Sequence, residues 1–255
     1  MPQKITIDGQ LEISVGASRN STNWKVNSLL WSELAQRLST THHTHETQAE
    51  YAALPTKKQD EIKDIGGFVG GYMIMPNRKK GSVLNRQIIT LDVDHGNADI
   101  WKLYTSLYSN AAVLYSTHKH KPDAPRLRLV IPLDRPAMAE EYEAIARKIA
   151  GTLGIESFDR TTFQMERLMY WPSTSKDGEY RYEVQDGDWL SADDVLRSYR
   201  DWRNTAEWPA SVKDTEALHR EIKRLGDPLE KKGHVGAFCR VYSITDVINT
   251  YLSNE

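Results

Sequence analysis

The amino-acid sequence predicts an α+β fold with a ferredoxin/RRM-like sheet, followed by a small C-terminal helical domain. Between residues 87 and 171, apolar runs typical of strands and two segments typical of helices follow one another in the order β-α-β-β-α-β. That order is the split βαβ pattern of a ferredoxin-like sheet. After about residue 188 the pattern becomes helical. We therefore divide the chain into a domain of residues 1–189 and a helical appendage of residues 190–255.

The elements before this pattern are predicted from periodicity. Residues 5–15 alternate well enough for a strand or hairpin, and residues 28–38 have apolar side chains at helical spacing with Ser28 as the N-cap. Residues 48–64 are polar and helical in pattern. The glycine-rich segment 66–71 lacks the Gly-Lys-Ser/Thr of a Walker loop, which favours a tight connection from helix to strand.

The remaining elements follow from apolar runs and breakers. The expected strands are 88–94, 111–116, 127–132 and 167–171, and the expected helices of the sheet are 99–109 and 140–153. The helical segments expected in the appendage are 191–202, 214–225 and 238–252.

Composition limits the class of protein. The 255 residues are 39% hydrophobic and 27% charged, as in globular domains, and no run of about 18 apolar residues predicts a membrane span. A single cysteine, Cys239, excludes a disulfide framework, and the N-terminus lacks the apolar core of a signal peptide. We therefore expect a cytoplasmic protein. With a net charge of −2, nucleic-acid binding would need a local basic groove.

Two carboxylates follow the apolar strand of residues 88–94. Because side chains alternate along a strand, Asp92 and Asp94 should project to one side while Leu91 and Val93 project to the other. Two acids so placed are costly unless a cation lies between them, and Mg²⁺ and Mn²⁺ prefer carboxylate oxygens. The alternative is an ordinary strand end with solvated acids.

Groups suited to phosphate follow on the next two strands. Ser116 and His118 have strand spacing, and a hydroxyl beside an imidazole can hold a phosphate. Arg126 and Arg128 also share one face, and arginine suits bidentate phosphate contact. The alternatives are a capped strand end with an exposed histidine and a solvated edge strand.

Further charged candidates lie on either side of these strands. Asp159 offers a third carboxylate for a metal, and Arg167 enters an apolar strand, so it needs an anionic partner. The alternative for Arg167 is a salt bridge within the core, for which Asp159 is one candidate partner. A template-binding role is considered for the basic residues beside the glycine-rich segment, although such runs are usually solvated faces. Those basic residues are Arg78, Lys79, Lys80 and Arg86.

In this order, the three motifs resemble the archaeo-eukaryotic primase superfamily: Asp-x-Asp on one strand, Ser-x-His on the next, and an Asp before a further strand. The chain more closely resembles the primase-polymerase domains of phages and mobile elements that precede a helicase of the virulence-associated E type. The stretches that carry this closer resemblance are residues 66–71, 89–94, 126–133 and 166–173, with residues 227–240 similar to the linker before the helicase.

The resemblance implies a metal-dependent nucleotidyltransferase that makes or extends primers on single-stranded DNA from NTPs or dNTPs, during replication in a bacterial host. Asp92, Asp94 and Asp159 would be catalytic ligands of two Mg²⁺ or Mn²⁺ ions. A helicase domain or partner is also implied. The residues expected to bind the nucleotide are Ser116, His118, Arg126, Arg128 and Arg167.

Two other readings remain open. A nicking enzyme of the HUH type would use His118 and His120 as its paired histidines, with Tyr104, Tyr108 or Tyr115 as nucleophile; Lys119 between the histidines departs from the apolar residue usual there. A non-catalytic single-strand binding module would keep the sheet but incorporate no nucleotide.

Overall fold

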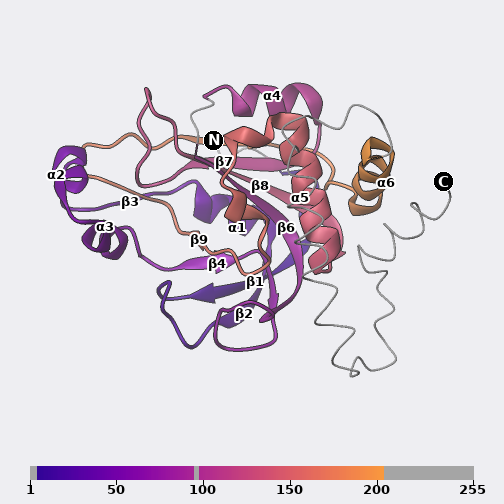
Figure 1. Cartoon of the computed structure of the whole chain (residues 1–255), viewed down its shortest axis with the longest axis horizontal. Helices are drawn as coiled ribbons and strands as arrows, with labels where there is room; N and C mark the ends of the chain where they lie inside the picture. The colour runs from indigo at the N-terminus through magenta and orange to yellow at the C-terminus, as the bar shows by residue number, and fades with distance from the viewer. Residues whose placement is uncertain (1–4, 95–97, 204–255) are drawn as a thin grey trace. The chain divides into compact units, whose positions relative to one another are not determined.

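The α+β prediction is confirmed by the computed structural model, in which helices cover antiparallel sheets (Figure 1). The structure describes residues 5–94 and 98–203, without the side chains of 200–203. The chain divides into two units, Met1–Tyr199 and Arg200–Glu255. Most of the predicted appendage therefore lies outside the described residues, including its expected helices at 214–225 and 238–252, and its boundary at residue 190 stays a prediction.

The main sheet has five strands. Its order is β11-β7-β8-β6-β5, and every neighbouring pair is antiparallel. The strands are β5 (Gly71–Met73), β6 (Val83–Val93), β7 (Ala112–Ser116), β8 (Leu127–Ala137) and β11 (Tyr182–Gln185). Helices α4 (Ile100–Leu107) and α5 (Ala139–Leu153) bury one core with the face of β6 that carries Ile89, Leu91 and Val93. The alternate residues of β6, including Asp92, therefore belong to the opposite face.

The split βαβ prediction is correct from β6 through α5, but wrong for the fourth strand. The segment expected at 167–171 forms β9 (Met169–Tyr170), which pairs with β4 (Gly67–Val69) in another sheet. The outer edge of β6 is already occupied, because β5 pairs with its beginning and Phe158 forms a bridge to Val93 at its end.

A four-stranded sheet of order β2-β1-β4-β9 contributes a second core with helix α1 (Trp31–Leu38). Its first strands are β1 (Gln10–Gly16) and β2 (Lys25–Leu30). Ser28 lies in β2, so the predicted N-cap is wrong, and the Glu33 carboxylate instead accepts a hydrogen bond from the Leu30 N–H at 2.8 Å. The glycine-rich segment supplies strands to both sheets. A Cβ at Gly71 would lie 2.0 Å from the Asn85 carbonyl oxygen, so this close pairing requires glycine.

Shorter elements complete the described residues. The polar helical segment is two helices, α2 (Gln48–Ala53) and α3 (Thr56–Ile62), interrupted at Pro55. The other short elements are β3 (His42–His43), β10 (Ser173–Thr174), the 3₁₀ turns η1 (Ile155–Ser157) and η2 (Arg160–Phe163), and helix α6 (Ala192–Arg203). None of the helices within the described ranges combines the length and apolar character needed to cross a bilayer.

Candidate functional site

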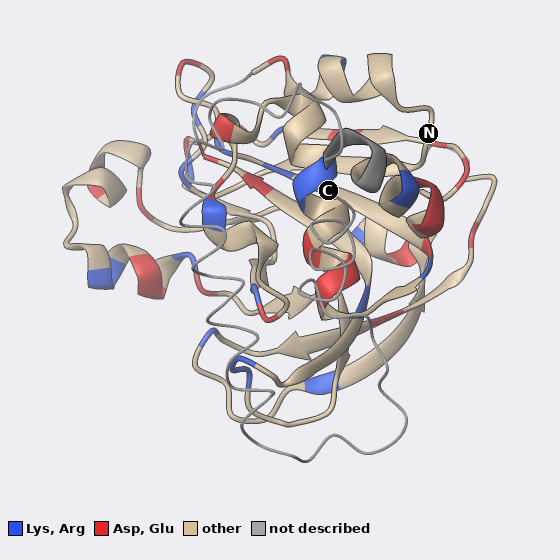
Figure 2. Cartoon of the chain, turned by 45° about the vertical axis from the view of Figure 1, so that its right-hand side comes forward, with Lys and Arg blue, Asp and Glu red and all other residues tan. Residues whose placement is uncertain are grey.

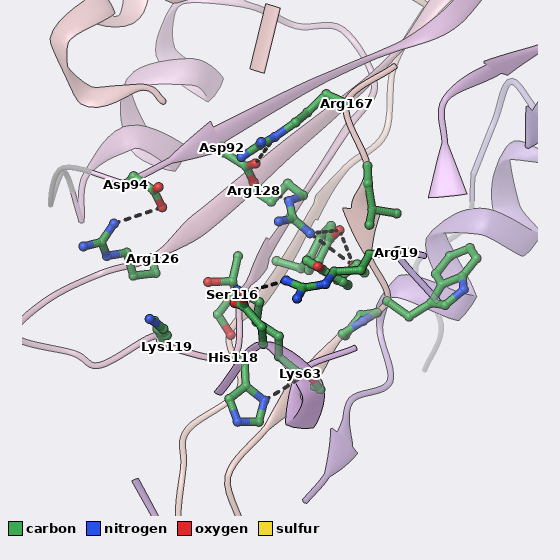
Figure 3. Close-up of a pocket in the computed structure, with 18 of the residues that line it drawn as sticks. Arg19, Lys63, Asp92, Asp94, Ser116, His118, Lys119, Arg126, Arg128 and Arg167 are labelled. Atoms are coloured by element: carbon green, nitrogen blue, oxygen red, sulfur yellow. Dashed lines mark hydrogen bonds and ion pairs between the residues drawn. The ribbon is translucent and has the colours of Figure 1, made fainter. Parts of the chain in front are cut away.

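A charged cavity of about 490 Å³ lies where β6 and β7 end and β8 begins; we call it the main cavity (Figure 3). Antiparallel pairing creates it, because Asp92 of β6 and Tyr115 of β7 both lie opposite Arg128 of β8. Seven basic side chains and three carboxylates line this cavity. They are Arg19, Lys63, Arg78, Lys119, Arg126, Arg128 and Arg167, with Asp60, Asp92 and Asp94.

This local excess of positive charge contrasts with the rest of the chain. Basic and acidic segments are interspersed along the ribbon (Figure 2), and the whole chain carries a net charge of −2. This cavity is therefore a local basic surface of the kind that nucleic-acid binding would need. A polyanionic ligand such as a triphosphate suits this lining.

Asp92 and Arg128 form a buried ion pair, with each side chain only 7% exposed. The Arg128 Nε donates to Asp92 Oδ1, and its Nη1 donates to the Tyr115 hydroxyl at 2.9 Å and to the Tyr170 carbonyl at 3.1 Å. Burial lowers the pKa of Arg128, but the attraction of Asp92 and these hydrogen bonds outweigh it, so the net pKa is raised. Arg128 is therefore a fixed charge on the cavity wall.

Asp94 and Arg126 form a second, more open ion pair. Arg126 Nη1 lies 3.0 Å from Asp94 Oδ1, and the two side chains are 39% and 38% exposed. Asp92 and Asp94 both line the main cavity, as strand alternation predicts. Their oxygens are the ligand type that Mg²⁺ and Mn²⁺ prefer, so the donor chemistry fits a divalent cation.

Asp159 is directed elsewhere. It caps η2, where Oδ1 accepts from the Thr161 N–H at 2.9 Å, and its Oδ2 accepts from Arg167 Nη2 at 2.6 Å. Within residues 5–94 and 98–203, no three His, Cys, Asp or Glu side chains converge to hold a metal. The predicted three-acid set is therefore not assembled in this structure, because the cap and the arginine hold Asp159 away from the main cavity.

Arg167 connects the two acids. Besides its bond to Asp159, its Nε lies 3.6 Å from Asp92 Oδ2, and its side chain lines the main cavity. The alternative of a salt bridge with Asp159 is thus confirmed, and its predicted contact with a nucleotide stays a prediction.

His118 lies in the wall with both ring nitrogens bonded. Nδ1 lies 3.0 Å from Ser173 Oγ, and Nε2 lies 3.2 Å from Glu46 Oε1. Burial lowers the pKa of His118 despite the attraction of Glu46. The hydrogen bond to Glu46 requires a proton on Nε2, since a carboxylate only accepts. Ser116 Oγ accepts from the Arg181 N–H at 2.9 Å. Both predicted phosphate ligands line the cavity, but their contact with phosphate stays a prediction.

Sequence reasoning missed three charged residues in the lining of the main cavity: Arg19, Asp60 and Lys63. Asp60 on α3 accepts from Arg19 Nη1 at 2.6 Å and lies 2.7 Å from Lys63 Nζ, and these two cations lower its pKa to about 2. Arg19 lies in a loop and Lys63 just after a short helix. Neither position carries a periodic pattern that would have identified it.

The predicted template residues have three different environments. Arg78 lines the main cavity and donates to the Glu166 carbonyl at 3.0 Å, whereas Lys79 and Lys80 are exposed outside it. Arg86 is fully buried, and its guanidinium lies 4.3 Å from the Tyr142 ring centroid. The prediction that Arg86 binds template is wrong, because a nucleic-acid template could not reach this side chain without unfolding of the core.

Comparison with known proteins gives two matches. The family model described as VapE N-terminal domain matches residues 1–211. Among solved structures, the chain is similar to the AEP domain of the cyanophage S-2L primase-polymerase (PrimPol). The two are 11% identical with a TM-score of 0.41, over 74% of this chain and 88% of that one. No curated protein matches the sequence.

Proposed function

The chain belongs to the VapE N-terminal domain family, and we propose that it is a primase-polymerase domain that makes or extends primers on single-stranded DNA. The observation that carries this proposal is the main cavity, where the carboxylates of Asp92 and Asp94 lie among seven basic side chains. Its substrates would be nucleoside triphosphates and a DNA template. It would act in replication of a phage or mobile element within the bacterial cytoplasm, together with a linked or partner helicase.

Asp92 and Asp94 would hold the divalent cations. When bound, Mg²⁺ or Mn²⁺ activates the attacking 3′ hydroxyl and neutralises charge on the leaving pyrophosphate. Asp159 would act indirectly, since its N–H donates to the Asp92 carbonyl at 2.9 Å and its carboxylate fixes Arg167. We therefore assign Asp159 a positioning role in place of a metal ligand.

The other residues would orient and stabilise the triphosphate. In nucleotidyl transfer the bond from O3′ to the α-phosphorus forms, the bond from that phosphorus to the pyrophosphate oxygen breaks, and the hydroxyl proton leaves to solvent. Fixed positive charge around the departing pyrophosphate stabilises that change. Arg128, which its contacts fix on the cavity wall, would supply such charge, and Arg126, whose pair with Asp94 is open, would be able to turn to a phosphate.

The nicking-enzyme alternative loses support from the positions of its nucleophiles. Tyr104 and Tyr115 have no exposed surface. Tyr108 stacks on Tyr104 with ring centroids 5.1 Å apart. The non-catalytic binding module is the stronger rival, because the same basic cavity would also hold DNA.

Labelled-nucleotide incorporation on single-stranded DNA, with and without a primer and with Mg²⁺ or Mn²⁺, tests the proposal. Asp94→Asn should abolish the products. Asp194→Asn, which removes an exposed carboxylate paired with Arg197 outside the cavity, should leave them unchanged. DNA binding without incorporation by the wild type would establish the binding module, and a covalent tyrosyl-DNA product would establish the nicking enzyme.

A further inference from the structure

A second cavity of about 320 Å³ adjoins the main cavity; we call it the side cavity. The two share the side chains of His118, Lys119 and Arg126. The other residues that line the side cavity are Gln48, Tyr51, Ala52, Gln59, His120, Lys121, Ala124 and Ser175. The transfer reaction proposed for the main cavity does not use this space.

We propose that the side cavity binds the initiating nucleoside triphosphate in primer-free synthesis, an inference that rests on the proposed function. Joining two free nucleotides requires two nucleotide sites whose edges meet, so that the 3′ hydroxyl of the first reaches the α-phosphorus of the second. The shared edge meets this requirement, because Arg126 lines both cavities and is paired with Asp94.

The charge of the side cavity suits a triphosphate. Lys119 and Lys121 are exposed, and neither forms an ion pair with any residue that the structure describes. A carboxylate side chain is missing from the lining altogether. The two lysines are therefore available to an anionic ligand.

Polar groups suited to a base or sugar complete the lining. His120 is 5% exposed, and its Nδ1 accepts from the Arg126 N–H at 3.2 Å, so Nε2 carries the proton and is a donor. The side-chain amide of Gln48 donates a hydrogen bond to the His120 carbonyl, and that of Gln59 donates one to the Leu54 carbonyl. Their amide oxygens remain as acceptors. A cavity of this size with a few polar groups is typical of a small-ligand site.

Lys121 provides the discriminating variant because it lines the side cavity alone. In Lys121→Glu, primer-free synthesis should need about tenfold more nucleotide, since loss of one charged contact costs about 1.4 kcal/mol or more. Extension of an annealed primer should be unchanged. Ala124→Trp, which fills the cavity from an exposed position without altering charge, should act in the same way. Lys102→Glu, on the exposed face of α4, is the matched control.

Direct binding keeps this inference separate from polymerase activity. Calorimetric titration of the full chain with an α,β-methylene nucleoside triphosphate should give two sites in the wild type, of which one is about tenfold weaker in Lys121→Glu. If the chain binds two nucleotides but incorporates none, the proposed polymerase activity is refuted and the second nucleotide site is retained. One site in both proteins, equal losses of initiation and extension, or displacement of the second nucleotide by an unrelated single-stranded DNA would overturn the proposal.

Discussion

The carboxylates of Asp92, in β6, and of Asp94, just after it, should differ sharply in what their loss costs the fold. Asp92 is buried against Arg128, with 7% of each side chain exposed, whereas Asp94 and Arg126 are 38% and 39% exposed. Removing one partner of a buried pair leaves an uncompensated charge in the core and costs about 3–5 kcal/mol. An open pair is screened by water and contributes about 0.2–1 kcal/mol. Asp92→Asn should therefore be the far more destabilising change.

Urea denaturation measures this difference. With a slope of about 2 kcal/mol per M, Asp92→Asn should lower the unfolding midpoint by about 1.5–2.5 M and Asp94→Asn by less than about 0.5 M. The Asp92→Asn/Arg128→Met double variant should recover part of the loss, because no buried charge is then left unpaired. Equal, small shifts for both single variants would refute the reasoning. Activity lost in Asp92→Asn is thus ambiguous, and Asp94→Asn tests the chemistry more directly.

Two further predictions concern the walls of the main cavity. Asp60→Asn should release Arg19 and Lys63 and tighten nucleoside triphosphate binding about two- to fivefold by titration; weaker binding would show that the carboxylate orders the wall. Burial lowers the pKa of His118 in the folded protein. The free energy of unfolding of the wild type should therefore fall as the pH drops below about 6.5, where the imidazole of the unfolded chain gains a proton. The unfolding free energy of His118→Gln should be less dependent on pH between about 7.5 and 5.5 than that of the wild type. If the two proteins lost stability in parallel over this range, His118 would not be the source of the pH dependence. The titratable groups that face the imidazole are Glu46, Tyr51, Lys63 and Lys119.

The acid pair was predictable because strand alternation is a local property. Its partners were not, because they depend on register. In the antiparallel pair β6·β8, Asp92 lies opposite Arg128, so the next residues on the same face, Asp94 and Arg126, also meet. Two acids and two arginines with the same spacing therefore neutralise each other pairwise. The topology expected for a split βαβ unit brings these strands together, but nothing in the sequence fixes their register to the residue.

The remaining contacts of the site depend on chain segments far apart in sequence. The partners of His118 are Glu46 and Ser173, which lie 72 and 55 residues away along the chain. The Asp60 pairs with Arg19 and Lys63 come from a loop and a short helix. Periodicity reports which face a residue occupies within one element. It carries no information about which loop closes over that face.

Arg86 shows how charge can mislead when it is considered without packing. It follows a basic loop in sequence, yet it is fully buried, and it donates to Thr90 Oγ1 at 2.7 Å and to the carbonyls of Gln164 and Met165 at 3.4 and 3.3 Å. Those carbonyls lie just before Arg167, which contacts Asp92. Burial lowers the pKa of Arg86, which shows that its environment does not favour the charge. Its hydrogen bonds therefore link the core to the segment that precedes Arg167, so the place of Arg86 in this fold is structural.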